Sequence, residues 1–437
     1  MLSSHITAEF AESREKDSQL ENSGKRGQSP IVAEFGETRP HTPPSHRHPQ
    51  PHFQQLAAPY IIPATAQIPL TPYPDPTAFS HGQVYPTALP APPLWAYMPV
   101  AQPVIPLSKP QEKRITQEIM SLYQSLLPTP LNITRRRKFV EKIQRILHEE
   151  YPGRQVDVHL FGSSANGLGT GGSDVDLCLV TDWERLQDVR FLAAGLKKHG
   201  IRRVTCIPNA RVPIVKLWDN ELFLACDINV NNPLALQNTE MIKTYVEIDA
   251  RARPFIMIIK HWARRRVLND AAKGGTLSTY AWMCMCINFL QMRTPSILPA
   301  LHQIPHTKRP DNAIVDGVDT SFCSDLDQLR GFGELNSESL GYLLYAFFRH
   351  FAFEYEYEKY VISVRCGKYL TKESKGWIGD RNYNLLCIES PMNVFRNLGN
   401  SADDITVHGL KNEFQRAYSI IVNGGSLSQV CEQYIEA

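Results

Sequence analysis

The sequence lacks two features of exported and membrane-bound chains: an apolar segment near its N-terminus and an uninterrupted hydrophobic run of membrane-spanning length. Its most apolar stretch, 281–290, contains Asn288 and is followed by Gln291. Acidic residues within 1–19 also argue against a mitochondrial presequence. These absences predict no membrane contact and a location in the cytoplasm, with the nucleus as the alternative.

Cysteine pairs at metal-binding spacing and a strong net charge are also missing. The nine cysteines are scattered without a C-x-x-C pair, and Cys178, Cys226 and Cys284 lie in apolar surroundings. This pattern favours buried free thiols in a reducing compartment. A net charge of only +2 excludes a global basic field, so any contact with nucleic acid must come from local patches.

Proline, by contrast, is abundant and unevenly distributed, because 20 of the 32 prolines fall within 1–110. Since proline removes amide donors and blocks helices, this segment is predicted to be a disordered tail, either a passive linker or a partner-binding segment. Two helices are expected in 111–150, the second capped by Asn132 or Thr134. The basic run at 135–138 in that helix is either an RNA-backbone contact or a solvated face.

The remaining chain divides into a strand-rich part and a helix-rich part. Within 151–245, five β-prone runs and one helical pattern at 183–199 predict a mixed sheet. Within 246–437 most patterns are helical, and the clearest is an apolar stripe from Leu340 to Phe351. The sequence therefore predicts an α+β fold in which a mixed sheet is followed by a mostly helical domain.

The most informative stretch is 161–180, which reads FGSSANGLGTGGSDVDLCLV. Because alternate side chains of a strand share a face, Asp174 and Asp176 should point the same way. Two neighbouring carboxylates are costly to keep ionised without a cation, and their oxygens suit Mg²⁺. The turn at Gly162 and Ser163 offers amide donors and a hydroxyl to a triphosphate. A surface turn built on Gly-Gly-Ser-Asp is the alternative.

A third carboxylate, Asp227, lies in the apolar strand pattern LFLACDINV. A salt bridge to a nearby lysine or arginine would explain it, and so would a role as a third metal ligand that accepts a proton from an attacking hydroxyl. Three acidic groups on adjacent strands can hold two divalent ions. Lys260 and Arg264 share a face at i and i+4 of one predicted helix and could flank a triphosphate.

These motifs occur in the same order in one known family. Together with CDINVNNPLALQNT, IKHWARRR and IESPMNVFRNLGN, they make the chain resemble the cytoplasmic poly(A) polymerases and terminal uridylyltransferases of the DNA-polymerase-β-like nucleotidyltransferase superfamily. The resemblance covers 111–435. It implies a catalytic nucleotidyltransferase domain at 151–245, a helical PAP-associated domain at 246–437 with the helices of 111–150 packed on it, and an active site in the cleft between the two domains.

The resemblance also implies roles for individual residues. Asp174, Asp176 and Asp227 would be the catalytic ligands of Mg²⁺ or Mn²⁺. Ser163 would contact the triphosphate, on a turn shaped by Gly162. The other nucleotide contacts implied are Asn238 and Thr239 for the ribose, Lys260 and Arg264 for the phosphates, and Tyr280 for stacking on the base.

Base selection is expected in the loop IESPMNVFRNLGN. The uridylyl-adding relatives carry an E-D-P-F-E-x-x-H-N pattern there, and the aligned positions in this chain are Ser390, Asn393 and Arg396. The histidine that would crowd out a purine is missing. Arg396 offers only donors, so it could reach N1 of adenine or a phosphate. ATP is therefore favoured over UTP, and Asn393 and Arg396 join the predicted nucleotide-binding residues.

The resulting hypothesis is a poly(A) polymerase that adds AMP from ATP to an RNA 3′ end without a template. A terminal uridylyltransferase that uses UTP is the alternative, and an inactive RNA-binding scaffold is a third reading. No RNP, zinc-knuckle or KH motif is present in the sequence. A partner protein that supplies RNA specificity is therefore expected.

Overall fold

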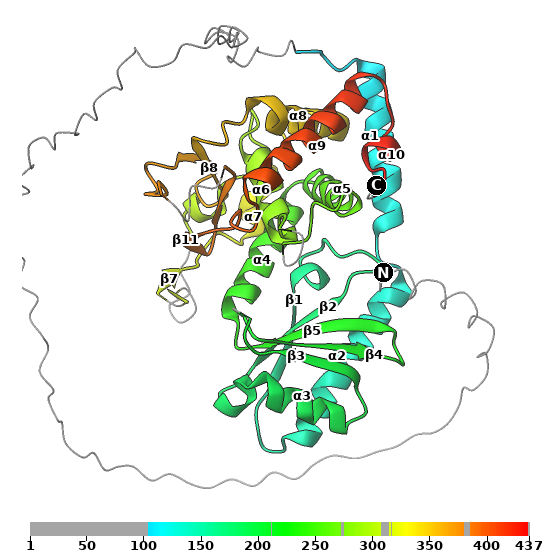
Figure 1. The fold of residues 1–437 in the computed structure, drawn as a ribbon, viewed down its shortest axis with the longest axis vertical. Coiled ribbons are helices and arrows are strands. Elements are labelled where there is room, and N and C mark those ends of the chain that lie inside the picture. The colour runs from blue at the N-terminus through cyan, green and yellow to red at the C-terminus, as the bar shows by residue number, and fades with distance from the viewer. Residues whose placement is uncertain are drawn as a thin grey trace, which may run out of the picture. The chain divides into compact units, whose positions relative to one another are not determined.

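The computed structural model describes residues 104–210, 212–271, 275–306, 314–315, 317–379 and 385–435. Within these ranges the chain forms two large hydrophobic cores, one beneath a five-stranded sheet and one among helices (Figure 1). Most of the tail predicted to be disordered lies outside the described residues. None of the helices in these ranges combines the length and apolar character needed to cross a bilayer.

The sheet is mixed, as the sequence predicts. Its strands are β1 (Asp157–Phe161), β2 (Val175–Val180), β3 (Arg202–Ile207), β4 (Ile214–Asp219) and β5 (Leu224–Val230). Their order is β1-β2-β5-β4-β3, and only the central pair β2–β5 is parallel. The register of that pair places Asp176 opposite Asp227. The carboxylates of the two strands therefore meet on one face of the sheet.

Helices α2 (Pro130–Glu150) and α3 (Val189–Lys198) cover the other face of the sheet (Figure 1). The N-cap of α2 is Thr129, whose hydroxyl accepts the amide of Asn132, so the cap predicted at Asn132 or Thr134 is wrong. Pro130 explains the earlier start, because its fixed φ and missing amide suit the first helical position. The single helix predicted at 183–199 is divided, since Asp188 ends a 3₁₀ turn and caps α3.

The prediction that all of 111–150 packs on the helical domain is wrong for α2. The buried side chains Phe139 and Ile143 of α2 belong to the sheet core, because the apolar stripe of this helix faces the strands. Helix α1 (Lys109–Leu126) instead places Ile115 and Ile119 in the helical core. The consecutive helices α1 and α2 therefore connect the helical core to the sheet core.

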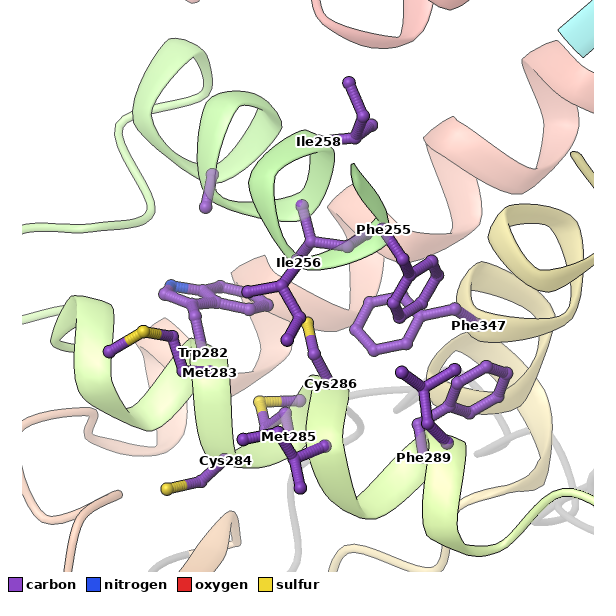
Figure 2. Close-up of a cluster of buried hydrophobic side chains, with 14 of the residues drawn as sticks. Phe255, Ile256, Ile258, Trp282, Met283, Cys284, Met285, Cys286, Phe289 and Phe347 are labelled. Atoms are coloured by element: carbon purple, nitrogen blue, oxygen red, sulfur yellow. The ribbon is translucent and has the colours of Figure 1, made fainter. Parts of the chain in front are cut away.

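The helical core brings together segments that are far apart in sequence. Figure 2 shows Phe255 and Ile256 of α5 packed against Trp282 and Phe289 of α6 and Phe347 of α8. Full burial of each large apolar side chain contributes about 1.5–3 kcal/mol. The helices of this part of the structure are α4 (Pro233–Ile248), α5 (Ala252–Arg265), α6 (Thr279–Gln291), the short α7 (Leu326–Leu329), α8 (Leu340–Arg349), α9 (Asp404–Val422) and α10 (Leu427–Val430).

A second sheet lies within the helix-rich part and was not expected from the sequence. Its strands are β8 (Tyr360–Ser363), β9 (Lys368–Thr371), β10 (Cys387–Ser390) and β11 (Asn393–Asn397), in the order β11-β10-β8-β9. Strands of four or five residues offer too few alternating positions to give a clear periodic signal. A separate two-stranded hairpin joins β6 (Ile314–Val315) to β7 (Val318–Asp319).

Candidate active site

The turn that follows β1 is shaped by Gly162. This residue has a φ of 61°, and a Cβ atom added to it would lie 2.7 Å from Oδ2 of Asp176. Glycine is therefore required both by the left-handed backbone and by the close approach of a carboxylate. The Gly162 amide donates to Oγ1 of Thr239 at 2.9 Å, which fixes the turn to α4. Ser163 is thus held beside Asp176.

The loop between this turn and Asp174 is held by the buried guanidinium of Arg136. Its Nη2 atom donates to the carbonyl oxygens of Thr170 and Ser173, each at 2.8 Å, and the residue is only 8% exposed. The sequence analysis allowed the basic run at 135–138 to be an RNA contact or a solvated face. Arg136 is neither, because it lies on the same helical face as the buried Phe139.

Two further cations, both from α5, hold the same loop. Arg253 Nε donates to the carbonyl of Gly167 and Lys260 Nζ donates to that of Leu168, each at 2.7 Å. Burial lowers the pKa of Lys260 to about 8. The predicted contact of Lys260 with phosphates stays a prediction.

The three predicted carboxylates are close enough to influence one another. Burial, followed by the negative charges of Asp227 and Asp174, raises the pKa of Asp176 from 3.8 to about 7. Burial and Asp227 also raise the pKa of Asp174, whereas the positive charges of Lys216 and Arg264 oppose this rise. Such mutual repulsion is expected where a cation belongs.

Asp227 itself forms an ion pair with Lys216 of β4, which is the salt-bridge alternative considered from the sequence. The antiparallel register places Lys216 directly opposite Asp227, so both side chains lie on the same face of the sheet. The side chain of Lys216 is 49% exposed. The pair therefore lies at an open edge of the site, where solvent weakens the attraction.

The donor set suits a divalent metal, although its members are not gathered around one point. Among the described residues, no group of three or more acidic, histidine or cysteine side chains is arranged to hold a metal ion. At this site the Asp227 carboxylate is paired with Lys216. Asp174 and Asp176 nevertheless offer hard oxygen donors whose repulsion a cation such as Mg²⁺ would relieve. The residues fit a metal of this kind.

Two adjoining cavities open on these side chains, with volumes of about 400 and 340 Å³. Both are lined by Ser163, Asp176 and Thr279, so the turn and the carboxylate lie where they meet. The larger cavity adds Asp174, Lys260 and Arg264, and the smaller one adds Gly162, Asn238, Thr239 and Tyr280. The two cavities thus bring together Asp174, Asp176 and the predicted residues of α4, α5 and α6, whereas Asp227 lines neither of them.

In the smaller cavity the polar side chains already have partners. The Tyr280 hydroxyl donates to Oδ1 of Asn238, whose amide group donates to the carbonyl of Leu234 at 2.7 Å. The Thr239 hydroxyl accepts the amide of Gly162 and donates to the carbonyl of Ala235. Thr239 therefore positions the turn, while its predicted ribose contact stays a prediction.

The two nucleotide-binding residues predicted in the base-selecting loop, Asn393 and Arg396, have different surroundings. Burial raises the pKa of Tyr280 well above its ordinary value, and the positive charge of Arg396 opposes this rise, so Arg396 lies near the phenol. The Asn393 side chain accepts the amide of Phe395 at 3.2 Å, which shapes the turn of the loop. Neither residue lines the two cavities.

Several residues of the site carried no recognisable motif. The Oδ1 atom of the buried Asn166 accepts the amide of Leu168, and Oγ1 of Thr279 donates to Oδ1 of Asn269. Their roles depend on contacts across the loop or between elements, so local patterns could not reveal them. The burial of Arg136, by contrast, could have been predicted, because its spacing from Phe139 places both residues on the buried face of the helix.

The pKa of Asp176 gives a prediction for the protein free of divalent metal. The carboxyl ionises near pH 4 in the unfolded chain and near pH 7 in the folded one, so a rise in pH between these values favours unfolding. We expect the melting temperature to fall more steeply between pH 5 and about pH 8 than in the Asp176→Asn variant. Thermal unfolding in the presence of a chelator measures both slopes, and equal slopes would contradict the assignment.

Comparisons with known proteins show which family the chain resembles. A family model described as "Poly(A) RNA polymerase, mitochondrial-like, central palm domain" matches 115–247, and one described as "Cid1 family poly A polymerase" matches 339–395. The poly(A) RNA polymerase cid13 of Schizosaccharomyces pombe is 42% identical over 73% of this chain and 55% of its own length. The poly(A) RNA polymerase cid11 of the same yeast is 40% identical over 74% of this chain and 66% of its own length.

A solved structure shares the same fold. The MgGTP-bound Cid1 poly(U) polymerase superposes with a TM-score of 0.66 and 30% identity, covering 74% of this chain and 100% of that chain. The fold is therefore of the polymerase-β-like nucleotidyltransferase class. The chain belongs to the Cid1 family of poly(A) polymerases and terminal uridylyltransferases.

Proposed function

We propose that this chain is a template-independent RNA 3′-terminal nucleotidyltransferase that adds AMP from ATP. The observation that carries the proposal is the meeting of Asp176 and Ser163 at the junction of two cavities, with Asp174 and Asp227 close enough to influence the Asp176 carboxyl. A glycine turn beside neighbouring carboxylates suits a triphosphate held through a metal. This argues against an inactive scaffold.

The cavities suggest how a nucleotide would be oriented. The larger cavity, with Lys260 and Arg264, would take the triphosphate, and the smaller one, with Tyr280, would take the nucleoside. To contact a phosphate, the Lys260 ammonium need only exchange the Leu168 carbonyl for a phosphate oxygen. Stacking on an aromatic ring such as Tyr280 contributes about 1–3 kcal/mol for any base.

In the proposed reaction the 3′ oxygen of the RNA forms a bond to the α-phosphorus. The bond from that phosphorus to the pyrophosphate breaks, and the hydroxyl proton passes to the carboxylate of Asp227. Lys216 must release Asp227 before this carboxylate can accept the proton.

Mg²⁺ or Mn²⁺ is the proposed cofactor. Asp174 and Asp176 would hold it, joined by Asp227 once Lys216 turns away. A metal bound there would neutralise phosphate charge and favour ionisation of the attacking oxygen. The MgGTP named for the Cid1 structure supports this class of metal without choosing between the two ions.

The choice of ATP rests on the loop that ends in Arg396. Ser390, Asn393 and Arg396 replace the acidic pair and the histidine expected of a uridylyl-adding enzyme. The two relatives named poly(A) RNA polymerases support the same choice, at 42% and 40% identity against 30% for the poly(U) polymerase. A terminal uridylyltransferase remains the second candidate because that structure covers the same share of the chain.

The test supplies ATP, UTP, CTP and GTP separately, each with Mg²⁺ or Mn²⁺ and a labelled oligo(A) primer. We expect extension with ATP to exceed extension with UTP. Faster extension with UTP would overturn the base assignment but keep the enzyme class. No extension with any nucleotide would refute the proposed activity.

The Arg396→His variant tests the loop directly. A histidine there would restore the residue of the uridylyl-adding relatives, and the change also removes the guanidinium, whose charge acts on Tyr280. We expect the ratio of kcat/KM for UTP to that for ATP to rise about tenfold. The control is Arg330→His, an exposed arginine paired with Asp327, which should leave the ratio unchanged.

We also propose a partner protein that supplies RNA specificity and a cytoplasmic location. The nine cysteines are all free thiols in the structure and most are buried, which is in keeping with a reducing compartment. With a net charge of +2, the affinity for RNA should be modest and should fall as salt is added.

A further inference from the structure

The turn after β9 carries a lysine that reaches two neighbouring strands. Lys375 Nζ donates to Oε2 of Glu389 on β10 at 2.5 Å and to the carbonyl of Val394 on β11 at 2.7 Å. It also lies 5.0 Å from the ring centroid of Trp377. One ammonium group therefore joins both strands of the hairpin that includes Arg396.

This contact is buried and well satisfied. The side chains of Lys375 and Glu389 are 14% and 3% exposed, and the other oxygen of Glu389 accepts the hydroxyl of Ser363 on β8 at 2.7 Å. Desolvating an ion pair is expensive, and it is compensated only when the remaining polar atoms have partners. Such a network favours one arrangement of the strands over its alternatives.

The hairpin needs this support because its own pairing is irregular. The β10–β11 register shifts between Glu389 and Ser390, which interrupts the regular pairing of the two strands. The carbonyl of Val394, two residues before Arg396, is held by Lys375 instead. Since alternate residues of a strand share a face, the position of Val394 sets the direction of Arg396.

The positive charge of Arg396 in turn acts on Tyr280, which lines the smaller cavity, although Arg396 itself does not line it. Glu389 also acquires a role from this arrangement. It occupies the first acidic position of the base-selecting loop, yet its carboxylate is directed into the second sheet rather than toward a base. The negative charge of Glu389 therefore stabilises the hairpin and is not used to recognise the nucleotide.

We infer that Lys375 is a positioning residue for base selection, which holds the β10–β11 hairpin and thereby sets the position of Arg396. The inference rests on the proposed function and deepens it. It predicts that losing Lys375 weakens discrimination between nucleotides more than it weakens RNA binding.

The experiment compares the full chain with its Lys375→Met and Lys375→Arg variants. We expect Lys375→Met to lower the ratio of kcat/KM for ATP to that for UTP about tenfold, with the KM for RNA unchanged. Lys375→Arg keeps two donors and should restore the ratio to within about twofold. The matched control is Lys368→Met, an exposed lysine on β9, which should change nothing.

Equilibrium binding of ATP and UTP to the same variants separates this inference from the proposed function. If the unmodified chain extends no primer, the proposed function fails, while the ratio of the two affinities still tests Lys375. An affinity ratio unchanged by Lys375→Met, or an equal loss for both nucleotides, overturns the inference. If Lys375→Met does not fold, Glu389→Gln must lower the same ratio, and an unchanged ratio in that variant overturns it instead.

Discussion

Replacing Asp176 with asparagine should lower nucleotide addition by about a thousandfold or more. The carboxylate lies at the junction of the two cavities, opposite Asp227 in the parallel register. Asparagine keeps the shape of the side chain but removes the negative charge that would hold a cation. Single-turnover extension of a labelled primer at saturating ATP measures the loss.

The same substitution should leave the fold intact and even stabilise it in the absence of divalent metal. Because the pKa of Asp176 is raised to about 7, its ionised form opposes folding at higher pH, and asparagine removes that cost. We expect a higher melting temperature at pH 8 together with lost activity. The control is the exposed Asp182→Asn, which should alter neither quantity. Undiminished extension by Asp176→Asn would refute the metal-site assignment.

Replacing Arg136 with methionine should have the second largest effect, a fall in kcat/KM of roughly a hundredfold. The guanidinium fixes the carbonyls of Thr170 and Ser173, directly before Asp174. Methionine fills similar space without donating, so the loop that carries Asp174 would lose its position. Each lost hydrogen bond from a charged donor also costs about 1.5–3 kcal/mol, and stability should fall as well.

The neighbouring Arg137 provides the control for this variant. Its side chain is exposed and lies 3.9 Å from Glu141, so Arg137→Met should leave the melting temperature and kcat/KM nearly unchanged. Arg136→Met is expected to lower both stability and kcat/KM. The activity of this variant is therefore measured well below its melting temperature. A destabilised variant that retained full kcat/KM at that temperature would limit Arg136 to a role in stability.

The strands of the sheet and the face on which their carboxylates lie could be predicted from the sequence, because both follow from local periodicity. The alternation of polar and apolar residues in β2 and β5 specifies which side chains face the core, and the burial of Val175 and Cys226 follows from it. The need for glycine at 162 was likewise predictable, since a Gly-Ser pair between two β-prone runs indicates a tight turn. The helix that begins at Leu340 could also be predicted, because its apolar residues recur at helical spacing.

Contacts between distant elements could not be read in this way. Lys216 lies opposite Asp227 only because β4 and β5 pair in one register, and the sequence gives no measure of that register. The second sheet escaped notice for the same reason, because its short strands are specified by buried partners such as Lys375 and Glu389. Positions that hold other residues in place are therefore the ones that single-sequence patterns miss.

The parallel pairing of the two central strands ties catalytic competence to correct folding. A slip of one residue between β2 and β5 would turn the acidic side chains toward the hydrophobic layer and expose the aliphatic ones. Misaligned chains would thus lose the proposed metal site together with the hydrophobic core, so the stability of the fold and the integrity of that site depend on the same strand register.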